Sequence, residues 1–205
     1  MKADIFQRLK QSNDNRSTQV MKSEIFYKGF PKIEKDVIQG VVKKLPLDIH
    51  NTVHEVSNSM VDYTLNGVVL SFPTRIYLHD VESDVLSKLN REERMILHCI
   101  YSRHCSGYVR EKHIRCILAE EFPIWVIPYL VKISDEYVVE ILEIIYEALK
   151  DRNTDFFKQF CDENNVSFYK SYDRMISYWN EYYRRSCHEF KNYVGRKLFV
   201  ECFGA

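Results

Sequence analysis

The stretch from Trp125 to Leu149, WVIPYLVKISDEYVVEILEIIYEAL, predicts two apolar helices joined by a turn at Ser134-Asp135. Pro128 lacks a backbone N–H, so it is tolerated in a first helical turn, and apolar residues continue past it at helical spacing. We therefore expect the first helix to begin between Pro123 and Ile127.

The second helix of this stretch is expected to open with negative charge. Ser134 can cap it by accepting bonds from backbone N–H groups, and Asp135 and Glu136 place carboxylates in the first turn, where the helix dipole favours them. Apolar residues then recur at three- and four-residue steps and predict a buried stripe. The stripe comprises Val138, Ile141, Leu142, Ile145 and Leu149.

A second helix pair is predicted immediately before the first. Asn90 followed by Glu93 indicates a capping box that opens a helix running through Tyr101. Gly107 can supply the left-handed residue at which a helix stops, and a further buried face runs from Val109 to Ile117. Two helix pairs in series favour a stacked helical repeat, an architecture that builds a surface for holding a partner.

The segments IPYLVKISDEYVVEILEIIYEAL and SGYVREKHIRCIL resemble HEAT-type or short HEAT-like repeats, in which a proline-bearing helix leads through an acidic turn to a helix opening with Val-Arg. Val109-Arg110 matches that opening, whereas Val138-Val139 lacks the arginine. The two openings are 29 residues apart, which is short for a standard repeat. The resemblance covers about residues 90 to 150, and it implies protein binding on stacked helices without catalytic residues.

The chain outside this region is expected to complete one helical domain. Residues 1–22 are polar and predict a mobile arm, and residues 23–205 predict a single domain. Its three parts are N-terminal helices and a hairpin (23–89), HEAT-like helix pairs (90–150) and an aromatic helical cap (151–205). Helices are predicted over Glu34–Lys44 and Leu47–Met60.

Asn66-Gly67 predicts a β-hairpin over about residues 61 to 72, because this dipeptide accepts the positive φ angles of a type I′ turn. Pro73 is expected to end the hairpin. The predicted fold class is therefore mainly α, with stacked antiparallel helix pairs and one small β-hairpin.

The C-terminal third is rich in aromatic residues. Phe156, Phe157 and Phe160 favour a short helix after Thr154, and residues 168–203 predict two further helices or one helix bent near Ser186. An aromatic stripe is formed by Tyr172, Met175, Ile176, Trp179, Tyr182 and Tyr183. This stripe either covers the end of the repeat stack or provides an interface, and both roles can hold on different faces.

Composition indicates a protein without a membrane span. The 205 residues carry 29 basic and 29 acidic side chains, so bulk attraction to nucleic acid or to an anionic membrane is not indicated. The apolar runs are too short to cross a bilayer, and the first residues lead into no signal-peptide core, so we expect a cytosolic protein. Its six cysteines occur singly in apolar helical segments, which favours structural thiols.

The sequence offers little catalytic chemistry. Three histidines and three cysteines fall within nineteen residues: His98, Cys99, His104, Cys105, His113 and Cys116. Neighbouring residues on a helix point about 100° apart, so the six cannot converge on one metal ion. Phosphate loops, zincin motifs and hydrolase elbows are absent from the sequence. We therefore expect no catalytic residue, no metal and no cofactor.

The basic residues before the acidic turn allow two interpretations. Arg103, His104 and Arg110 surround a predicted helix start, whose free N–H groups could bind an anion. Alternatively, Arg103 or Arg110 pairs with the following acidic segment and ties one helix pair to the next. In that case Arg110 is expected to be buried against Glu136 or Glu140.

The leading functional hypothesis is a non-enzymatic protein-binding module, such as an adaptor or an immunity-type inhibitor that covers another protein. The alternative is nucleic-acid or nucleotide binding through the basic helix start, with tyrosines offering stacking surfaces. The candidate binding residues are Arg103, His104, Tyr108, Arg110, Lys112, Arg115, Tyr172, Trp179 and Tyr183.

Overall fold

A computed structural model describes residues 24–31, 33–46 and 56–205. The predicted arm over residues 1–22 and most of the helix predicted over Leu47–Met60 lie outside the described residues. Residues 56–60, the last part of that predicted helix, are described and are not helical, so the prediction is wrong there. Val56 forms an isolated bridge with Ile76, and Met60 begins a strand.

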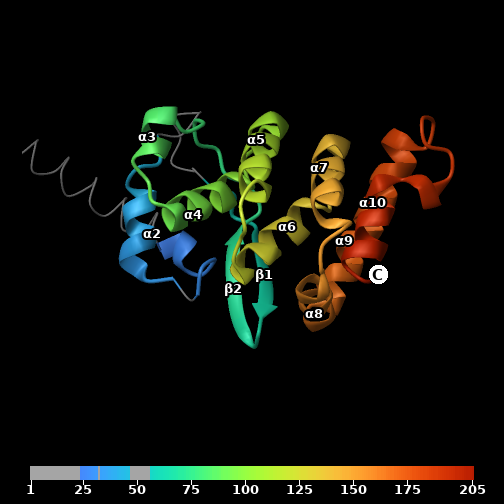
Figure 1. Cartoon of the computed structure of the whole chain (residues 1–205), viewed down its shortest axis with the longest axis horizontal. Coiled ribbons are helices and arrows are strands. Elements are labelled where there is room, and N and C mark those ends of the chain that lie inside the picture. Colours follow the sequence, from blue (N-terminus) through green and yellow to red (C-terminus); the bar gives the residue numbers. More distant parts are fainter. Residues whose placement is uncertain (1–23, 32, 47–55) are drawn as a thin grey trace, which may run out of the picture.

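The described part of the chain is mainly helical and contains one antiparallel hairpin, which confirms the predicted fold class (Figure 1). Its elements are α2 (Lys35–Val42), β1 (Met60–Leu65), β2 (Val68–Pro73), α3 (Ser83–Ser87), α4 (Arg91–Tyr101), α5 (Gly107–Leu118), η1 (Ile124–Val126), α6 (Ile127–Ile133), α7 (Val139–Leu149), α8 (Asp155–Glu163), α9 (Asn165–Tyr178), the π-helical turn η2 (Trp179–Tyr183), η3 (Phe190–Asn192), α10 (Val194–Lys197) and the π-helical turn η4 (Leu198–Cys202). No described helix is long and apolar enough to cross a membrane.

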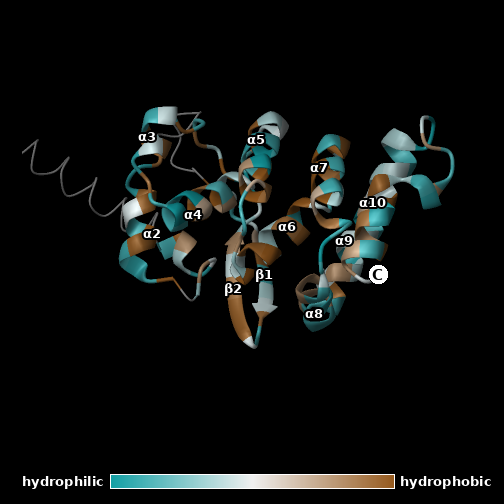
Figure 2. Ribbon diagram, in the orientation of Figure 1, coloured by the Kyte–Doolittle hydropathy of each residue, from teal (hydrophilic) through white to brown (hydrophobic). Residues whose placement is uncertain are grey.

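The helices stack in sequence order. Helix α5 packs against α7, and α7 packs against α10 and η4, so these elements stand in a row (Figure 1). Helix α4 packs against α5 and α2, and α6 packs against α8. Every residue of α6 is buried, and Figure 2 shows the hydrophobic character of α6 and β2 at the centre of the molecule.

The predicted capping box of α4 is confirmed. The Asn90 side chain accepts a bond from the Glu93 N–H, and the Glu93 carboxylate accepts one from the Asn90 N–H. Gly107, however, does not end a helix with a left-handed conformation; it is the first residue of α5. Helix α4 stops earlier because the segment after it pairs with Ile76, whose N–H donates to Arg103 and whose carbonyl accepts from Cys105.

The prediction that Ser134 caps α7 is wrong. The Ser134 hydroxyl donates to the Leu130 carbonyl, one turn back in α6, and α7 begins only at Val139. Residues 134–138 form a connecting turn, and its two acidic side chains, Asp135 and Glu136, are buried.

The predicted hairpin is confirmed, with β1 and β2 joined by Asn66 at φ 52° and Gly67 at φ 75°. The junction of α8 and α9 holds the hairpin. Glu163 accepts from the Asn66 and Gly67 N–H groups, and Asn164 bonds both the N–H and the carbonyl of Thr64. Two adjacent side chains therefore join the hairpin to the C-terminal helices, about 100 positions away in the sequence.

Replacing Asn164 by alanine is expected to lower the free energy of unfolding by about 2 kcal/mol, because the Thr64 N–H and carbonyl lose their partners in a half-buried site. Urea denaturation measures the change. Asn165→Ala is the matched control, since Asn165 is exposed and makes no side-chain hydrogen bond to a described residue. Equal stability of the two variants would contradict the anchoring role.

The C-terminal third forms the predicted helices. Helix α8 follows Thr154, and the region after residue 168 contains two helical parts separated by an irregular stretch around Ser186. Phe168 and Tyr172 of α9 pack on Phe199, at ring-centroid distances of 5.5 Å. Part of the aromatic stripe, including Tyr172, thus packs on the last helical segment, whereas Tyr182 is exposed. All six cysteines are free thiols.

Candidate functional site

The turn between α6 and α7 is built around a buried carboxylate. Glu136 is 4% exposed, and its Oε1 accepts from Arg75 Nη1 at 2.7 Å and from Arg103 Nη2 at 3.0 Å. Its Oε2 lies 2.9 Å from Arg110 Nη2. The predicted pairing of Arg103 or Arg110 with the acidic segment is therefore confirmed for both arginines. Three segments of the chain converge on one side chain.

Arginine charge keeps Glu136 ionised. Burial alone would raise the pKa of this carboxyl, but Arg103, Arg110 and Arg75 outweigh that effect and hold the pKa below its ordinary value. Arg110 is also fixed by two bonds from Nη1 to the carbonyls of His104 and Cys105. Positive charge exceeds negative charge here, and Nε and Nη1 of Arg103 have no hydrogen-bond partner among the described residues.

Asp135 fixes the other side of the same turn. It is buried, and its Oδ2 accepts from Lys132 Nζ at 2.6 Å, Arg174 Nη1 at 2.7 Å and Ser171 Oγ at 2.9 Å. Lys132 belongs to α6, and the other two belong to α9. Two consecutive carboxylates therefore tie the turn to elements on both sides of it, which leaves its backbone little freedom.

Tyr137 follows the two buried carboxylates and lies at the surface, 49% exposed. Its carbonyl accepts a bond from the Tyr183 hydroxyl, which also accepts from the Val139 N–H at 3.3 Å. The first N–H of α7 is thus satisfied by a tyrosine from η2. These contacts position Tyr137 and Tyr183 at the start of α7.

A hollow of about 350 Å³ lies beside these tyrosines, and we call it the tyrosine groove. It is lined by Gly107, Tyr108, Glu111, Tyr137, Val138, Glu140 and Tyr183. Helix α5 and the start of α7 thus form the groove with η2. Tyr108 is 87% exposed, which is unusual for an aromatic side chain.

Further tyrosines extend the aromatic surface beyond the groove. Tyr137 lies 5.9 Å from Tyr178 and 6.1 Å from Tyr182, measured between ring centroids. Tyr182 is 59% exposed. An exposed group of tyrosines is typical of a protein interface, because the ring gives a large contact area and the hydroxyl remains able to bond.

The groove carries negative charge. Glu111 is paired with Arg115 at 2.9 Å, whereas Glu140 and Glu143 form no ion pair with a described residue. The pKa of Tyr183 is raised, first by burial and also by Glu140 and Glu143, although the bond from Val139 opposes this. Glu140 and Glu143 are therefore close enough for their negative charge to affect Tyr183, a residue of the groove lining.

The basic residues chosen from the sequence are committed to internal partners. Arg103, His104 and Arg110 are buried, and His104 Nε2 bonds the Leu78 carbonyl at 2.7 Å. Lys112 pairs with Asp80, and Arg115 with Glu111. Arg103, His104 and Arg110 would have to leave buried partners to contact nucleic acid, whereas Lys112 and Arg115 remain about half exposed in surface ion pairs. The structure therefore gives this alternative no direct support.

The aromatic candidates divide between core and surface. Trp179 is buried and donates its indole N–H to the Cys187 carbonyl, and Tyr172 packs on Phe199. Only Tyr108 and Tyr183 of the nine predicted residues line the groove. Tyr137 and Glu140 were missed. The sequence feature that could have identified Tyr137 as a surface residue is its position at a turn, directly after two acidic residues.

Two of the clustered histidines meet in the interior. His98 Nδ1 lies 2.8 Å from His113 Nδ1, and His113 Nε2 lies 3.0 Å from Asp80 Oδ1. The ring of Tyr101 stacks on His113 with centroids 4.6 Å apart. No group of three or more histidine, cysteine or acidic side chains within the described residues is arranged to hold a metal ion. The chain of contacts is a packed polar network in the core.

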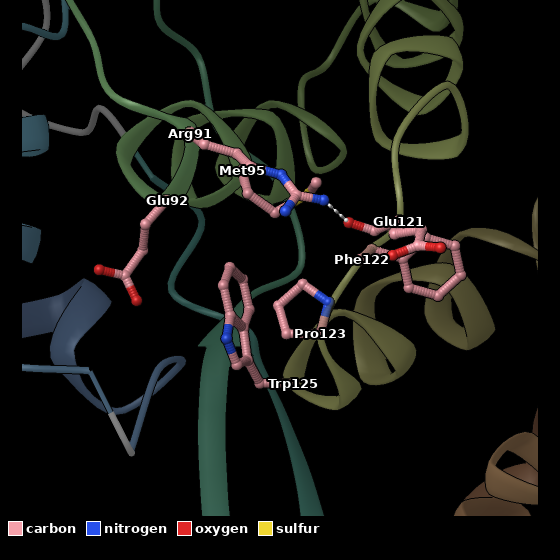
Figure 3. Close-up of a pocket in the computed structure, with 7 residues that line it drawn as sticks. All are labelled: Arg91, Glu92, Met95, Glu121, Phe122, Pro123 and Trp125. Atoms are coloured by element: carbon pink, nitrogen blue, oxygen red, sulfur yellow. Dashed lines mark hydrogen bonds between the residues drawn. The ribbon is translucent and has the colours of Figure 1, made fainter.

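A second hollow, of about 440 Å³, lies between the start of α4 and η1 (Figure 3). Arg91 crosses it and donates to the Glu121 carbonyl at 2.6 Å. Trp125 and Pro123 form one wall, and the buried Trp125 ring packs edge-on against Phe30. Because Arg91 also bonds Glu120, its guanidinium ties α4 to the segment before η1.

The fold and the site define a mainly α stack of helices with a rigidly held groove of exposed tyrosines. No protein-family model, curated protein or solved structure matches the sequence.

Proposed function

We propose that this chain is a non-enzymatic protein-binding module that holds its partner on the tyrosine groove, as an adaptor or an immunity-type inhibitor. The observation that carries the proposal is the hollow at the start of α7, which is lined by Tyr108, Tyr137 and Tyr183 and flanked by the exposed Tyr182. The resemblance of residues 90 to 150 to HEAT-type repeats supports the same function, because stacked helices commonly present such surfaces.

Rigidity of the groove supports the proposal. The turn that presents Tyr137 is fixed by Glu136, which forms ion pairs with three arginines, and by Asp135, which forms ion pairs with Lys132 and Arg174. A surface that is already ordered loses little conformational entropy on binding, so more of the contact energy becomes affinity. This organisation suits a site that holds a partner.

Alanine at both Tyr108 and Tyr137 is expected to abolish capture of the partner from native lysate, because tyrosines at the centre of an interface often cost 2 kcal/mol or more, about 30-fold in affinity, when truncated. Affinity capture with quantitative mass spectrometry measures the loss. Stability should change little, since Tyr108 is almost fully exposed and Tyr137 is half exposed.

The matched control is Tyr169→Ala, which removes a tyrosine of similar exposure on α9, outside the groove. A protein captured by the wild type and by Tyr169→Ala, but lost in the double variant, supports the proposal. If every captured protein survives the double variant, the groove is not the binding site.

A further inference from the structure

The lining of the tyrosine groove has the chemistry of a cation site. Tyr108, Tyr137 and Tyr183 present aromatic rings, whose faces attract ammonium and guanidinium groups, and Glu111 and Glu140 add carboxylates. No lysine or arginine lines the groove. Its volume, about 350 Å³, lies near the lower end of the range for ligand pockets, roughly 300 to 1,000 Å³.

Negative charge in the groove is not neutralised from within the described chain. Glu140 has no cationic partner there, and one turn further along α7 the same holds for Glu143. Glu111 shares its charge with Arg115, whose side chain remains more than half exposed. A cation that enters the groove would therefore gain attraction without displacing an ion pair of Glu140.

The buried arginines below the groove do not reverse this preference. Arg110 lies next to the groove, with Nη2 3.7 Å from the position that a Cβ on Gly107 would occupy. This side chain is 1% exposed, and Glu136 and two backbone carbonyls hold it. An anionic ligand would meet Glu111 and Glu140 at the rim and would not reach the guanidinium.

We propose that the tyrosine groove receives an arginine or lysine side chain of the partner protein, with the cation between the tyrosine rings and Glu140. This inference rests on the proposed function and specifies the chemistry of the partner. Charge complementarity commonly determines which partner an interface accepts, and the carboxylates and tyrosines of the groove lining would complement a cation.

The test uses the full chain and two synthetic peptides, acetyl-(Gly-Arg)4-amide and the same peptide with citrulline at each arginine position. Citrulline keeps the shape of the side chain but has no charge. The arginine peptide is expected to bind at least about fivefold more tightly, to weaken as salt is added, and to shift the ring resonances of Tyr108 and Tyr137 in NMR spectra.

Glu140→Gln is expected to weaken binding of the arginine peptide about threefold to tenfold. Glu147→Gln, two turns further along α7, is the matched control and should leave binding unchanged. Equal affinity for the two peptides, or tighter binding of an acetyl-(Gly-Glu)4-amide peptide, would overturn the inference.

Capture of the natural partner separates this inference from the proposed function. If the partner is lost with the tyrosine double variant but binds Glu140→Gln and Glu111→Gln/Glu140→Gln as well as wild type, the groove binds protein without a cationic contact. The inference then fails and the proposed function stands. If no partner depends on the tyrosines, the proposed function fails whatever the peptides show.

Discussion

Replacing Glu136 by glutamine is expected to lower the free energy of unfolding by about 3 to 5 kcal/mol. The change leaves Arg75, Arg103 and Arg110 around a neutral side chain, and two of these guanidinium groups are almost fully buried. Each would then lack the charge that offsets its removal from water. Urea denaturation followed by circular dichroism measures the loss.

Two further variants make this expectation specific. Arg110→Ala should cost less, about 2 kcal/mol, because Glu136 keeps Arg75 and Arg103 while the His104 and Cys105 carbonyls lose a donor. Glu143→Gln is the control, since its exposed carboxylate forms no ion pair with a described residue, and it should change stability by no more than about 0.5 kcal/mol. A Glu136 variant as stable as the control would show that the charge cluster is not buried in solution.

Stability is expected to fall as the pH is lowered from 7 to 5, by about 2 kcal/mol for each of His98 and His113 at pH 5. Burial lowers the pKa of His98 to about 3, with His113 adding to the effect, and burial lowers the pKa of His113 to about 4 although Asp80 opposes it. The unfolded chain therefore takes up protons first, near the ordinary histidine pKa of about 6.5. The stability that each neutral histidine contributes is fully present above that pH and is lost progressively down to about pH 4 for His113 and about pH 3 for His98.

Denaturant titrations at pH 7, 6 and 5 test this dependence. His113→Gln is expected to be less stable at pH 7 but to show a shallower decline, because one of the buried histidines that titrate in this range is gone. His188→Gln removes an exposed histidine on the surface and should leave the slope unchanged. A free energy of unfolding that is constant between pH 7 and pH 5 would contradict burial of the neutral histidines.

Local signals predicted most helices and the hairpin correctly, because the residues that define them are neighbours in sequence. The capping box of Asn90 and Glu93 spans three residues, and Asn66-Gly67 sets the hairpin turn by its own φ angles. Apolar spacing likewise predicted the buried face of α7, where Ile141, Leu142 and Ile145 lie in the core. In each case the residues that determine the structure are separated by only a few positions in the sequence.

Predictions from short sequence patterns were wrong where residues far away in the sequence determined the local structure. Gly107 was expected to end a helix, but α4 stops before it because Ile76 pairs with the backbone of Arg103 and Cys105. Ser134 was expected to cap α7, but the turn after it is drawn inward by charges on other elements. Helix geometry indicated that the clustered histidines and cysteines cannot all converge, but it did not identify the neighbour of His98, which is His113, fifteen positions away.

The sequence by itself determined that this protein is mainly α, with helix pairs in series and one hairpin, because helix periodicity, caps and turns depend on short-range backbone geometry. It also indicated that an arginine of the Arg103–Arg110 region would pair with the acidic turn. Only the tertiary structure decided that Arg75 joins them, that Asp135 takes Arg174 from α9, and that the turn consequently presents Tyr137 beside Tyr108 and Tyr183. The physical reason is that a buried carboxylate requires several cations at once, and these come from segments that meet only when the chain is folded.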